Sequence, residues 1–363
     1  METQMKAAIL REFGSPLTVE MLPAPVLGTG EVIVDIAAAP VLNYAAEVLS
    51  GARQYLLNLP AVPGPGAIGQ VRAIGADATH LAVGDWVWCD PTFRSRDDAP
   101  YPDITLQGWS ARGPGGLRLQ DLFGHGTWAE QTLIPTENAI LIGDISPDDA
   151  PSWCKIGAFL VPYGGLLAAD LKAGETVLIS GATGGFGSAG VATALAMGAG
   201  AVVATGRNAK ALADLKDRFG ARVFPVQMTG EEEVDRSAIQ AAAPGEIDVV
   251  LDILPPAALP SQARAAIMAV RPYGRVVLMG GIGMEGGGIL ELPYVWIMRN
   301  CVSIIGNWMY DATAPRDMVK LIKSGLIDID NYQIQPFPLE QAPEAVAHAA
   351  RHAGPFELTV LRP

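Results

Sequence analysis

The sequence is poor in cysteine, and this bounds its chemistry. Its 363 residues include three cysteines, Cys89, Cys154 and Cys301, and no two of them form a CxxC pair. Such wide spacing excludes a disulfide framework and a cysteine-rich zinc site, and it is typical of a reducing compartment. We therefore expect a cytoplasmic protein.

Long apolar runs and positive charge are also scarce. No run of 18 or more apolar residues occurs, so we expect no transmembrane helix and no membrane partner. Residues 1–6 lack the basic-then-apolar order of a signal peptide, so we expect none. Lysine and arginine total 25 against 38 acidic residues, a formal net charge of −13. This balance argues against a nucleic-acid partner, which needs a basic face.

Glycine, by contrast, is abundant and in one place has an informative context. Residues 176–179 are apolar and β-prone, residues 181–190 read GATGGFGSAG, and an Ala-rich stretch follows. A strand, a glycine turn and a helix start bring backbone N–H groups to a pyrophosphate. A tight turn without a ligand is the alternative interpretation. The expected cofactor contacts are Gly181, Thr183, Gly184, Gly185, Phe186 and Gly187.

A second short strand, residues 202–204, precedes the segment that selects the nucleotide. NAD sites place an acidic residue at the end of that strand, where it binds the ribose hydroxyls. Here the segment is Thr205, Gly206, Arg207 and Asn208, without an acid. The Arg207 guanidinium can pair with a 2′-phosphate. The sequence therefore favours NADP(H) over NAD(H), with a solvated Arg207 as the alternative.

The pattern of the chain changes near residue 160. Before it, short apolar runs alternate with Gly and Pro turns, which indicates strands. After it, strands and helices alternate, which predicts a doubly wound parallel sheet. Strands that end at Ile253 and Gly280 add two candidate cofactor-binding residues. We expect an α/β protein with a β-rich domain at 1–160, completed by 301–363, and a Rossmann domain at 161–300.

Several short motifs follow one another in a characteristic order. They are Gly30-Glu31-Val32, Val83-Gly84-Asp85, Gly126-Thr127-Trp128, Leu171-Lys172-Ala173-Gly174 before the glycine turn, and Arg271-Pro272-Tyr273-Gly274. Over essentially the whole chain, this order resembles the medium-chain dehydrogenase/reductase superfamily. The resemblance implies a GroES-like β-rich catalytic domain with a Rossmann domain inserted before the C-terminal tail.

The chain departs from the zinc-dependent members of that family. A catalytic zinc takes three protein ligands and leaves one position open. By the family's spacing, the ligand positions fall on Leu42, Pro65-Gly66 and the neighbourhood of Gly157, and none of these can bind zinc. Residues 92–123, where a structural-zinc lobe would lie, contain no cysteine. The resemblance is therefore to the zinc-independent, quinone oxidoreductase-like branch, and we expect no metal.

Without zinc, another group must stabilise the negative charge that develops when hydride arrives. Tyr44 falls where zinc members carry a hydroxyl of their proton relay. Asn43 lies next to a position where quinone oxidoreductase-like members carry an Asn. We expect Tyr44, with Asn43, to donate to the substrate oxygen, because a phenol can act as a general acid. Packing of Tyr44 in the cleft wall without chemistry is the alternative.

These observations predict an NADPH-dependent oxidoreductase that transfers hydride to a small apolar carbonyl compound. The preferred acceptor is the activated C=C of a quinone or enone. Two alternatives stay open, namely a zinc-free alcohol dehydrogenase or ketone reductase, and a non-catalytic NADPH-binding redox sensor.

Two further segments invite expectations. Residues 289–309 include an expected edge strand that could pair across a two-fold axis, so we expect a homodimer. Residues 94–119 are expected to form a long loop, which could shape the substrate mouth through Trp109 and Tyr101 or cover a subunit face.

Overall fold

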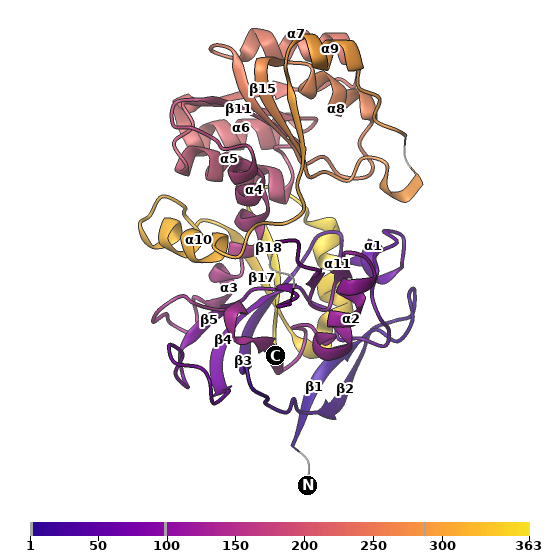
Figure 1. Ribbon diagram of the computed structural model, residues 1–363, viewed down its shortest axis with the longest axis vertical. Helices are drawn as coiled ribbons and strands as arrows, with labels where there is room; N and C mark the ends of the chain where they lie inside the picture. Colours follow the sequence, from indigo (N-terminus) through magenta and orange to yellow (C-terminus); the bar gives the residue numbers. More distant parts are fainter. Residues whose placement is uncertain (1–2, 98–99, 287) are drawn as a thin grey trace. The chain divides into compact units, whose positions relative to one another are not determined.

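The computed structural model describes residues 3–97, 100–286 and 288–363, and the chain divides into two compact units (Figure 1). Unit 1 comprises Met1–Gly157, Ile329–Ala353 and Glu357–Pro363, and unit 2 comprises Ala158–Asp328 and Gly354–Phe356. Each unit is built around its own sheet.

Unit 1 contains a seven-stranded sheet in the order β10-β5-β4-β3-β18-β17, with β9 paired to β3. Its strands are β3 (Glu31–Val41), β4 (Ala67–Ile74), β5 (Trp86–Cys89), β9 (Gln131–Pro135), β10 (Ala139–Leu141), β17 (Gln333–Pro338) and β18 (Glu357–Arg362). The last strand, β18, pairs antiparallel with β3 through Val360 and Pro40. The C-terminal strand therefore rejoins the first part of the chain, as the sequence predicts.

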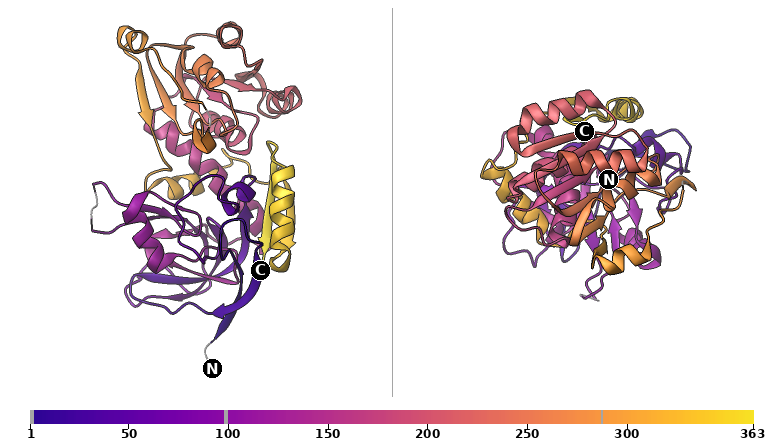
Figure 2. Two further views of the ribbon diagram at one scale, coloured as in Figure 1. Left: turned by 90° about the vertical axis from the view of Figure 1, so that its right-hand side faces the viewer. Right: turned by 90° about the horizontal axis from the view of Figure 1, so that it is seen from above.

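Shorter elements complete unit 1. They are β1 (Gln4–Ile9), β2 (Thr18–Pro23), α1 (Ala45–Leu49), α3 (Ala150–Trp153), α11 (Ala342–Arg351) and the 3-10 turns η1 (Thr136–Asn138) and η4 (Leu339–Gln341). Strands β1 and β2 form a separate antiparallel pair. Helix α11, yellow in Figure 2, lies alongside β18.

Residues 94–119 do not form the long loop that we expected. Half of them belong to a three-stranded sheet and a helix, namely β6 (Thr92–Arg94), β7 (Ile104–Leu106), β8 (Ser110–Ala111) and α2 (Gly113–Phe123). Gln120 of α2 holds this part together, because its Nε2 donates to Thr105 Oγ1 at 3.1 Å and to the Leu56 carbonyl at 3.2 Å. Trp109 is fully buried, whereas Tyr101 is exposed.

Unit 2 contains a six-stranded parallel sheet in the order β13-β12-β11-β14-β15-β16. Its strands are β11 (Thr176–Ser180), β12 (Ala201–Gly206), β13 (Val223–Gln227), β14 (Ile247–Asp252), β15 (Val270–Leu278) and β16 (Ser303–Gly306). Its helices are α4 (Ile156–Ala168), α5 (Gly185–Ala196), α6 (Ala209–Phe219), α7 (Glu232–Ala242), α8 (Pro260–Ile267), α9 (Tyr294–Arg299) and α10 (Ala314–Lys323), with the 3-10 turns η2 (Gly220–Arg222) and η3 (Met284–Gly286).

The middle residues of the central strands are apolar because both faces of this sheet are covered. Val177 and Ile179 of β11 face a core that includes residues of α4, α5 and α6. Leu178 of the same strand faces the opposite core, which includes residues of α7 and α8. The alternation of neighbouring residues between two cores produces the doubly wound architecture that the sequence predicts.

Unit 2 extends beyond residue 300, where we expected the chain to return to the first domain. Strand β16 pairs with β15 and so belongs to the parallel sheet. Packing continues past it, because a Cβ on Gly164 would lie 2.3 Å from the Met309 carbonyl oxygen. The first segment of this unit runs to Asp328, and residues Gly354–Phe356 also belong to it.

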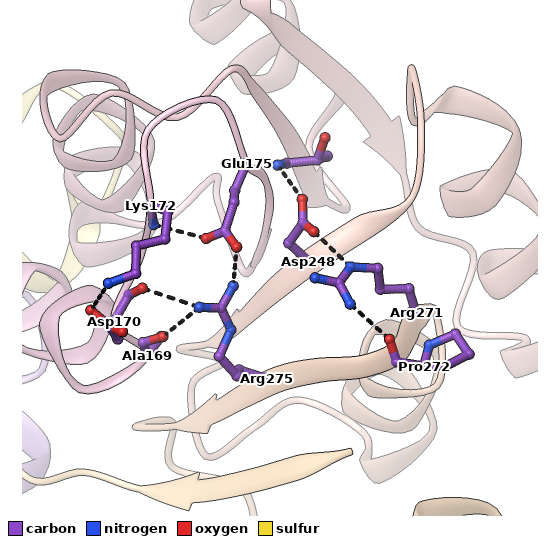
Figure 3. A network of polar contacts seen from close by, with 9 residues as sticks. Ala169, Asp170, Lys172, Glu175, Asp248, Arg271, Pro272 and Arg275 are labelled. Carbon is purple, nitrogen blue, oxygen red and sulfur yellow. Dashed lines mark hydrogen bonds and ion pairs between the residues drawn. The ribbon is translucent and has the colours of Figure 1, made fainter. Parts of the chain in front are cut away.

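A polar network ties the amino ends of β11, β14 and β15 together (Figure 3). Arg275 pairs with Glu175 and donates to the carbonyl oxygens of Ala169 and Asp170 at 3.0 and 3.1 Å. Asp248 accepts from the Thr176 N–H at 2.8 Å and from Arg271 Nε at 2.7 Å. The network lies at the amino edge of the sheet, opposite to the carboxyl edge that carries the glycine turn.

Within the part of the chain that the structure describes, no helix has the length and apolarity needed to cross a membrane.

Candidate functional site

The glycine turn connects β11 to α5 at the carboxyl edge of the parallel sheet (Figure 1). Gly181 directly follows β11 and has φ +90°, a conformation that L side chains rarely adopt. A Cβ on Gly187 would lie 2.0 Å from the Gly181 carbonyl oxygen, so only glycine allows α5 to pack this closely on the turn. The turn is therefore shaped as the sequence predicts.

The start of α5 presents unpaired N–H groups. Within the described ranges, the backbone N–H groups of Thr183, Gly185 and Gly187 have no hydrogen-bond acceptor. Such groups at a helix start carry partial positive charge and favour an anion. Gly184 precedes the helix in an extended conformation. This arrangement suits one phosphate group of a dinucleotide.

The end of β12 lies directly against the turn. The Ala182 N–H donates to the Thr205 carbonyl at 2.8 Å, and Thr205 Oγ1 donates to the Ile179 carbonyl at 3.2 Å. A Cβ on Gly206 would lie 2.3 Å from Thr183 Cγ2, so the two segments touch. The structure thus brings together the two halves of the expected cofactor site, although the Thr205 side chain is buried.

Arg207 and Asn208 follow at this edge and differ in their surroundings. Arg207 is exposed, its carbonyl accepts from Gln227 Nε2 at 3.3 Å, and its guanidinium has no partner within residues 3–97, 100–286 and 288–363. Asn208 Oδ1 accepts from the Ala211 N–H at 3.1 Å and so caps α6. Arg207 is therefore available to an anion, while the amide oxygen of Asn208 serves the helix.

Ile253 and Gly280 lie at the same edge of the sheet. The Ile253 N–H donates to the Ser180 carbonyl at 3.1 Å. A Cβ on Gly280 would lie 2.8 Å from the Leu254 carbonyl oxygen and 2.9 Å from Asp252 Oδ2. The loops after β11, β12, β14 and β15 therefore gather at one edge, where ligands bind in open parallel sheets.

Asp252 lies at the same edge and is a candidate site residue that was not predicted from the sequence. It ends β14, its side chain is buried, and its Oδ1 has no hydrogen-bond partner among the described residues. Burial raises the pKa of Asp252 to about 6, and contacts with Ser180 and the Leu254 backbone oppose this rise. An acidic residue at the end of an otherwise apolar strand is the sequence signal that would have identified it.

Tyr44 lies in unit 1 at the start of α1, and Asn43 precedes it; both are partly buried. The ring of Tyr44 packs edge-to-face with Trp109, with centroids 5.9 Å apart and planes at 67°. Trp109 in turn packs edge-to-face with Trp128, whose Nε1 donates to the Pro40 carbonyl at 3.1 Å. Trp109 is therefore a buried support of Tyr44, whereas the sequence suggested that it could shape the substrate mouth.

Arg53 completes this cluster and was not predicted. Its Cζ lies 4.0 Å from the centroid of the Tyr44 ring, the geometry of a cation–π contact. Its Nε donates to Glu47 Oε2 at 2.8 Å, and its Nη1 donates to the Tyr55 hydroxyl at 3.4 Å. Only 10% of the Arg53 side chain is exposed. A buried cation thus lies over the face of the candidate general acid.

The surroundings of Tyr44 act on its pKa in opposite directions. Burial raises the pKa of Tyr44 well above its ordinary value, and Tyr55 and Glu47 raise it further. Arg53 and Trp109 lower it, because they favour the charged phenolate. Tyr44 is therefore protonated at neutral pH and can donate a proton or a hydrogen bond.

Two of the residues that the sequence analysis assigned to zinc-ligand positions, Gly66 and Gly157, lie against an indole ring. A Cβ on Gly66 would lie 2.4 Å from Trp88 Cη2, and a Cβ on Gly157 would lie 3.2 Å from the same atom. Trp88 is fully buried, and Cys154 Sγ donates to the Ala38 carbonyl at 3.3 Å. Among the residues that the structure describes, no group of three or more His, Cys, Asp or Glu side chains could hold a metal ion.

Two sequence models of known domains match the chain. The alcohol dehydrogenase GroES-like domain matches residues 28–144, within unit 1. The zinc-binding dehydrogenase domain matches residues 185–324, within unit 2 and starting in the glycine turn. The expected combination of a GroES-like domain and a Rossmann domain is therefore confirmed.

Individual relatives agree with these matches. An alcohol dehydrogenase of Moraxella sp. (strain TAE123) is 32% identical over 202 residues, which cover 53% of this chain and 56% of that enzyme. The match thus spans little more than half of that enzyme's length.

Solved structures share the fold over the whole chain. A zinc-binding dehydrogenase of Sinorhizobium meliloti 1021 bound to NADP has a TM-score of 0.79 at 21% identity and covers 100% of both chains. A short chain alcohol dehydrogenase of E. coli CFT073 complexed with NADH has a TM-score of 0.81 at 18% identity and covers 99% of each. At these identities the likeness shows the fold alone.

Proposed function

Since the chain belongs to the medium-chain dehydrogenase/reductase superfamily, we propose that it is an NADPH-dependent oxidoreductase that reduces a small apolar carbonyl compound. The activated C=C of a quinone or enone is the preferred acceptor. The observation that carries the proposal is the glycine turn, whose unpaired N–H groups lie beside an acid-free end of β12. The bound nicotinamide would supply the hydride.

The choice of NADP(H) rests on the exposed Arg207. Its guanidinium has no partner in the described ranges, and no carboxylate in residues 205–208 would repel a 2′-phosphate. The N–H groups of Thr183, Gly185 and Gly187 would hold the pyrophosphate. One related fold is bound to NADP and another to NADH, so the fold alone does not select between them.

Independence of zinc rests on Trp88. Its indole packs against Gly66 and Gly157, two positions where zinc members carry ligands. Ring carbons of Trp88 therefore occupy the space beside both glycines. Neither glycine offers a donor atom on a side chain. The chemistry of this site suits no Lewis acid, so the substrate oxygen must be stabilised by a hydrogen-bond donor.

Tyr44 is the donor that we propose, with Asn43 beside it in the chain. The phenol remains protonated at neutral pH because burial raises its pKa. Its proton passes to the substrate oxygen while hydride is added at carbon. Trp109 packs edge-to-face on the Tyr44 ring and so helps to hold the donor in place.

We further propose a cytoplasmic homodimer. Cys89 and Cys154 are free and buried, which is compatible with a reducing compartment. Strand β16 is at the edge of its sheet, and Tyr294, Val295 and Met298 of the adjoining helix α9 are exposed. A second copy of the chain could cover both features about a two-fold axis.

The deciding experiment is product analysis with NADPH. The purified protein is dialysed against EDTA and supplied with NADPH and, in separate assays, cyclohex-2-enone and phenanthrenequinone. Loss of the enone C=C, at a rate unchanged by EDTA, is the expected result. Formation of an allylic alcohol would instead identify a C=O reductase. Tight NADPH binding without turnover of any carbonyl compound would favour a redox sensor, and loss of activity with EDTA would contradict zinc independence.

A further inference from the structure

The cluster around Tyr44 holds a buried charge whose role the proposed function does not explain. Arg53 lies on the turn that follows α1, and its backbone N–H donates to the Glu47 carbonyl at 3.3 Å. The turn folds the side chain back over the ring of Tyr44, where the guanidinium is largely removed from water. Burial of a cation is unfavourable unless a charged partner and hydrogen bonds compensate for the lost hydration.

The compensation comes from one carboxylate and two phenols. Glu47 pairs with Arg53 Nε at 2.8 Å, and this carboxylate is about half exposed, so water screens its charge. Tyr55 accepts from Arg53 Nη1 at 3.4 Å. The Tyr44 ring lies at 4.0 Å, within the range where an opposite charge shifts a pKa. The described groups that act on the Tyr44 phenol include Tyr55, Arg53, Trp109 and Glu47.

We propose that Arg53 is a positioning residue that stabilises the phenolate form of Tyr44 after proton transfer, and so supplies part of the positive charge that zinc supplies in other members of the family. This inference rests on the proposed function, in which Tyr44 is the donor. The Tyr44 O–H bond breaks and its proton forms a bond with the substrate oxygen. The electron pair stays on the phenolate, the substrate carbon takes hydride from the dihydronicotinamide, and water later returns the proton to Tyr44.

Arg53 matters because the phenol would otherwise be too weak an acid. Burial alone opposes the phenolate, and Arg53 acts in the other direction. Glu47 orients the guanidinium through Nε, which leaves its face to the ring. The arrangement keeps Tyr44 neutral before the reaction and lowers the barrier for giving up its proton.

The test measures the acidity of position 44 directly. A ring-fluorinated tyrosine at position 44 titrates far below tyrosine, within the pH range that a folded protein tolerates, and its absorbance or fluorine NMR signal reports ionisation. We expect Arg53→Met to raise its pKa by roughly 1–3 units. Arg53→Lys keeps the charge, so its pKa at position 44 should exceed the wild-type value by no more than half of the rise seen in Arg53→Met. Arg72→Met is the matched control, since Arg72 pairs with Asp35 at 3.3 Å and should leave the pKa unchanged.

A kinetic comparison separates this inference from the proposed function. With NADPH and the acceptor that is turned over, Arg53→Met should slow single-turnover hydride transfer at least tenfold. It should have almost no effect in the Tyr44→Phe background, because Arg53 acts through the phenol. An unchanged pKa in Arg53→Met, or equal slowing in both backgrounds, would overturn the role of Arg53. If Tyr44→Phe itself is as fast as wild type, the proposed donor is wrong, whatever the pKa shift.

Discussion

Arg207 is the residue on which the choice of nucleotide depends. It is exposed at the end of β12 and has no partner within the described residues. A charge-assisted hydrogen bond contributes about 1.5–3 kcal/mol, so we expect Arg207→Ala to weaken NADPH binding roughly tenfold to a hundredfold and NADH binding little. Fluorescence titration with both nucleotides measures the ratio.

The control for this substitution is a second exposed cation of unit 2. Lys320 pairs with Asp317 at 2.8 Å, far along the chain from the glycine turn. Lys320→Ala changes the net charge equally and should leave both affinities unchanged. If Arg207→Ala weakens NADPH and NADH to the same extent, the assignment of the 2′-phosphate to Arg207 is wrong.

The raised pKa of Asp252 predicts that the stability of the protein depends on pH. Its pKa rises from 3.8 to about 6 because the carboxyl is buried in the fold. Between these values the folded protein binds more protons than the unfolded chain, so this group's contribution to stability falls as pH rises from about 4 to about 6 and is then constant. The change amounts to at most roughly 3 kcal/mol, since one pKa unit corresponds to 1.36 kcal/mol.

Melting temperatures at pH 4.5 and pH 7 provide the measurement. From pH 4.5 to pH 7, the melting temperature of Asp252→Asn should fall less than that of wild type, because the ionisable group is gone. Asp217→Asn, on the exposed surface of α6, serves as the control and should follow wild type. Identical pH dependence in wild type and Asp252→Asn would contradict the raised pKa.

Local patterns explain which of these residues could be predicted from the sequence. Gly181 and Gly187 are recognisable because the turn that needs them is encoded within a few residues. Tyr44 follows from family spacing. Arg53 does not, because its position over the ring depends on how the turn after α1 folds back. The contacts of Trp88 and Trp109 could not be predicted, since their neighbours come from distant parts of the chain.

At the scale of elements, those that depend on contacts between residues close in sequence are predicted well, and those that depend on distant residues are not. The strand–turn–helix at 176–196 depends on local pattern and agrees with β11 and α5. In the segment 94–119, apolar and polar residues seldom alternate as they do in a strand, so we expected a loop. Its strands form through antiparallel pairing of Thr92 with Leu106 and of Thr105 with Ala111. Those pairs are stabilised by α2 packing on them, which no short window of sequence reveals.

The network at the amino edge of the parallel sheet predicts how its elements are held (Figure 3). Arg275 pairs with Glu175, and both side chains are largely buried. It also binds two carbonyl oxygens just after the end of α4. Arg275→Met should therefore destabilise unit 2 by about 1–3 kcal/mol, because it leaves a carboxylate and two carbonyls without their donor.

A neighbouring pair in the same network supplies the control. Lys172 pairs with Asp170, and both side chains are mostly exposed. Lys172→Met should change stability by less than about 1 kcal/mol, as is usual for surface ion pairs. Calorimetric melting of the three proteins distinguishes the two cases. Equal melting temperatures for wild type and Arg275→Met would show that the network contributes nothing.

At the scale of the whole molecule, the sequence pattern changes near residue 160, and the first unit's long N-terminal segment ends at Gly157. The end of the second unit is harder to predict from the sequence. The chain after residue 300 is apolar and contains a strand, which fits either sheet. Strand β16 joins the parallel sheet because its Ile304 and Ile305 pair with Val276 and Val277 of β15. Sequence pattern gives the type of a strand, whereas its partner is decided by packing.

The same edge of unit 2 predicts the oligomeric state. Strand β16 pairs only with β15 within the described chain, and Tyr294 and Met298 lie one helical turn apart on α9 with more than half of each side chain exposed. An apolar helix beside an open sheet edge is covered when two copies meet about a two-fold axis. Light scattering should therefore give a mass of about twice the 38.0 kDa of one chain.

Substitution on α9 tests whether this face is the contact. The double variant Tyr294→Lys, Met298→Lys places two charges on the apolar face, and their desolvation on association is unfavourable, so we expect a monomer. Leu122→Lys, at an exposed apolar position of α2 in unit 1, should leave the mass of the dimer unchanged. A wild-type monomer at micromolar concentration would exclude the homodimer. A double variant that remains dimeric would place the contact on another face, since two lysines cannot be buried there without partners.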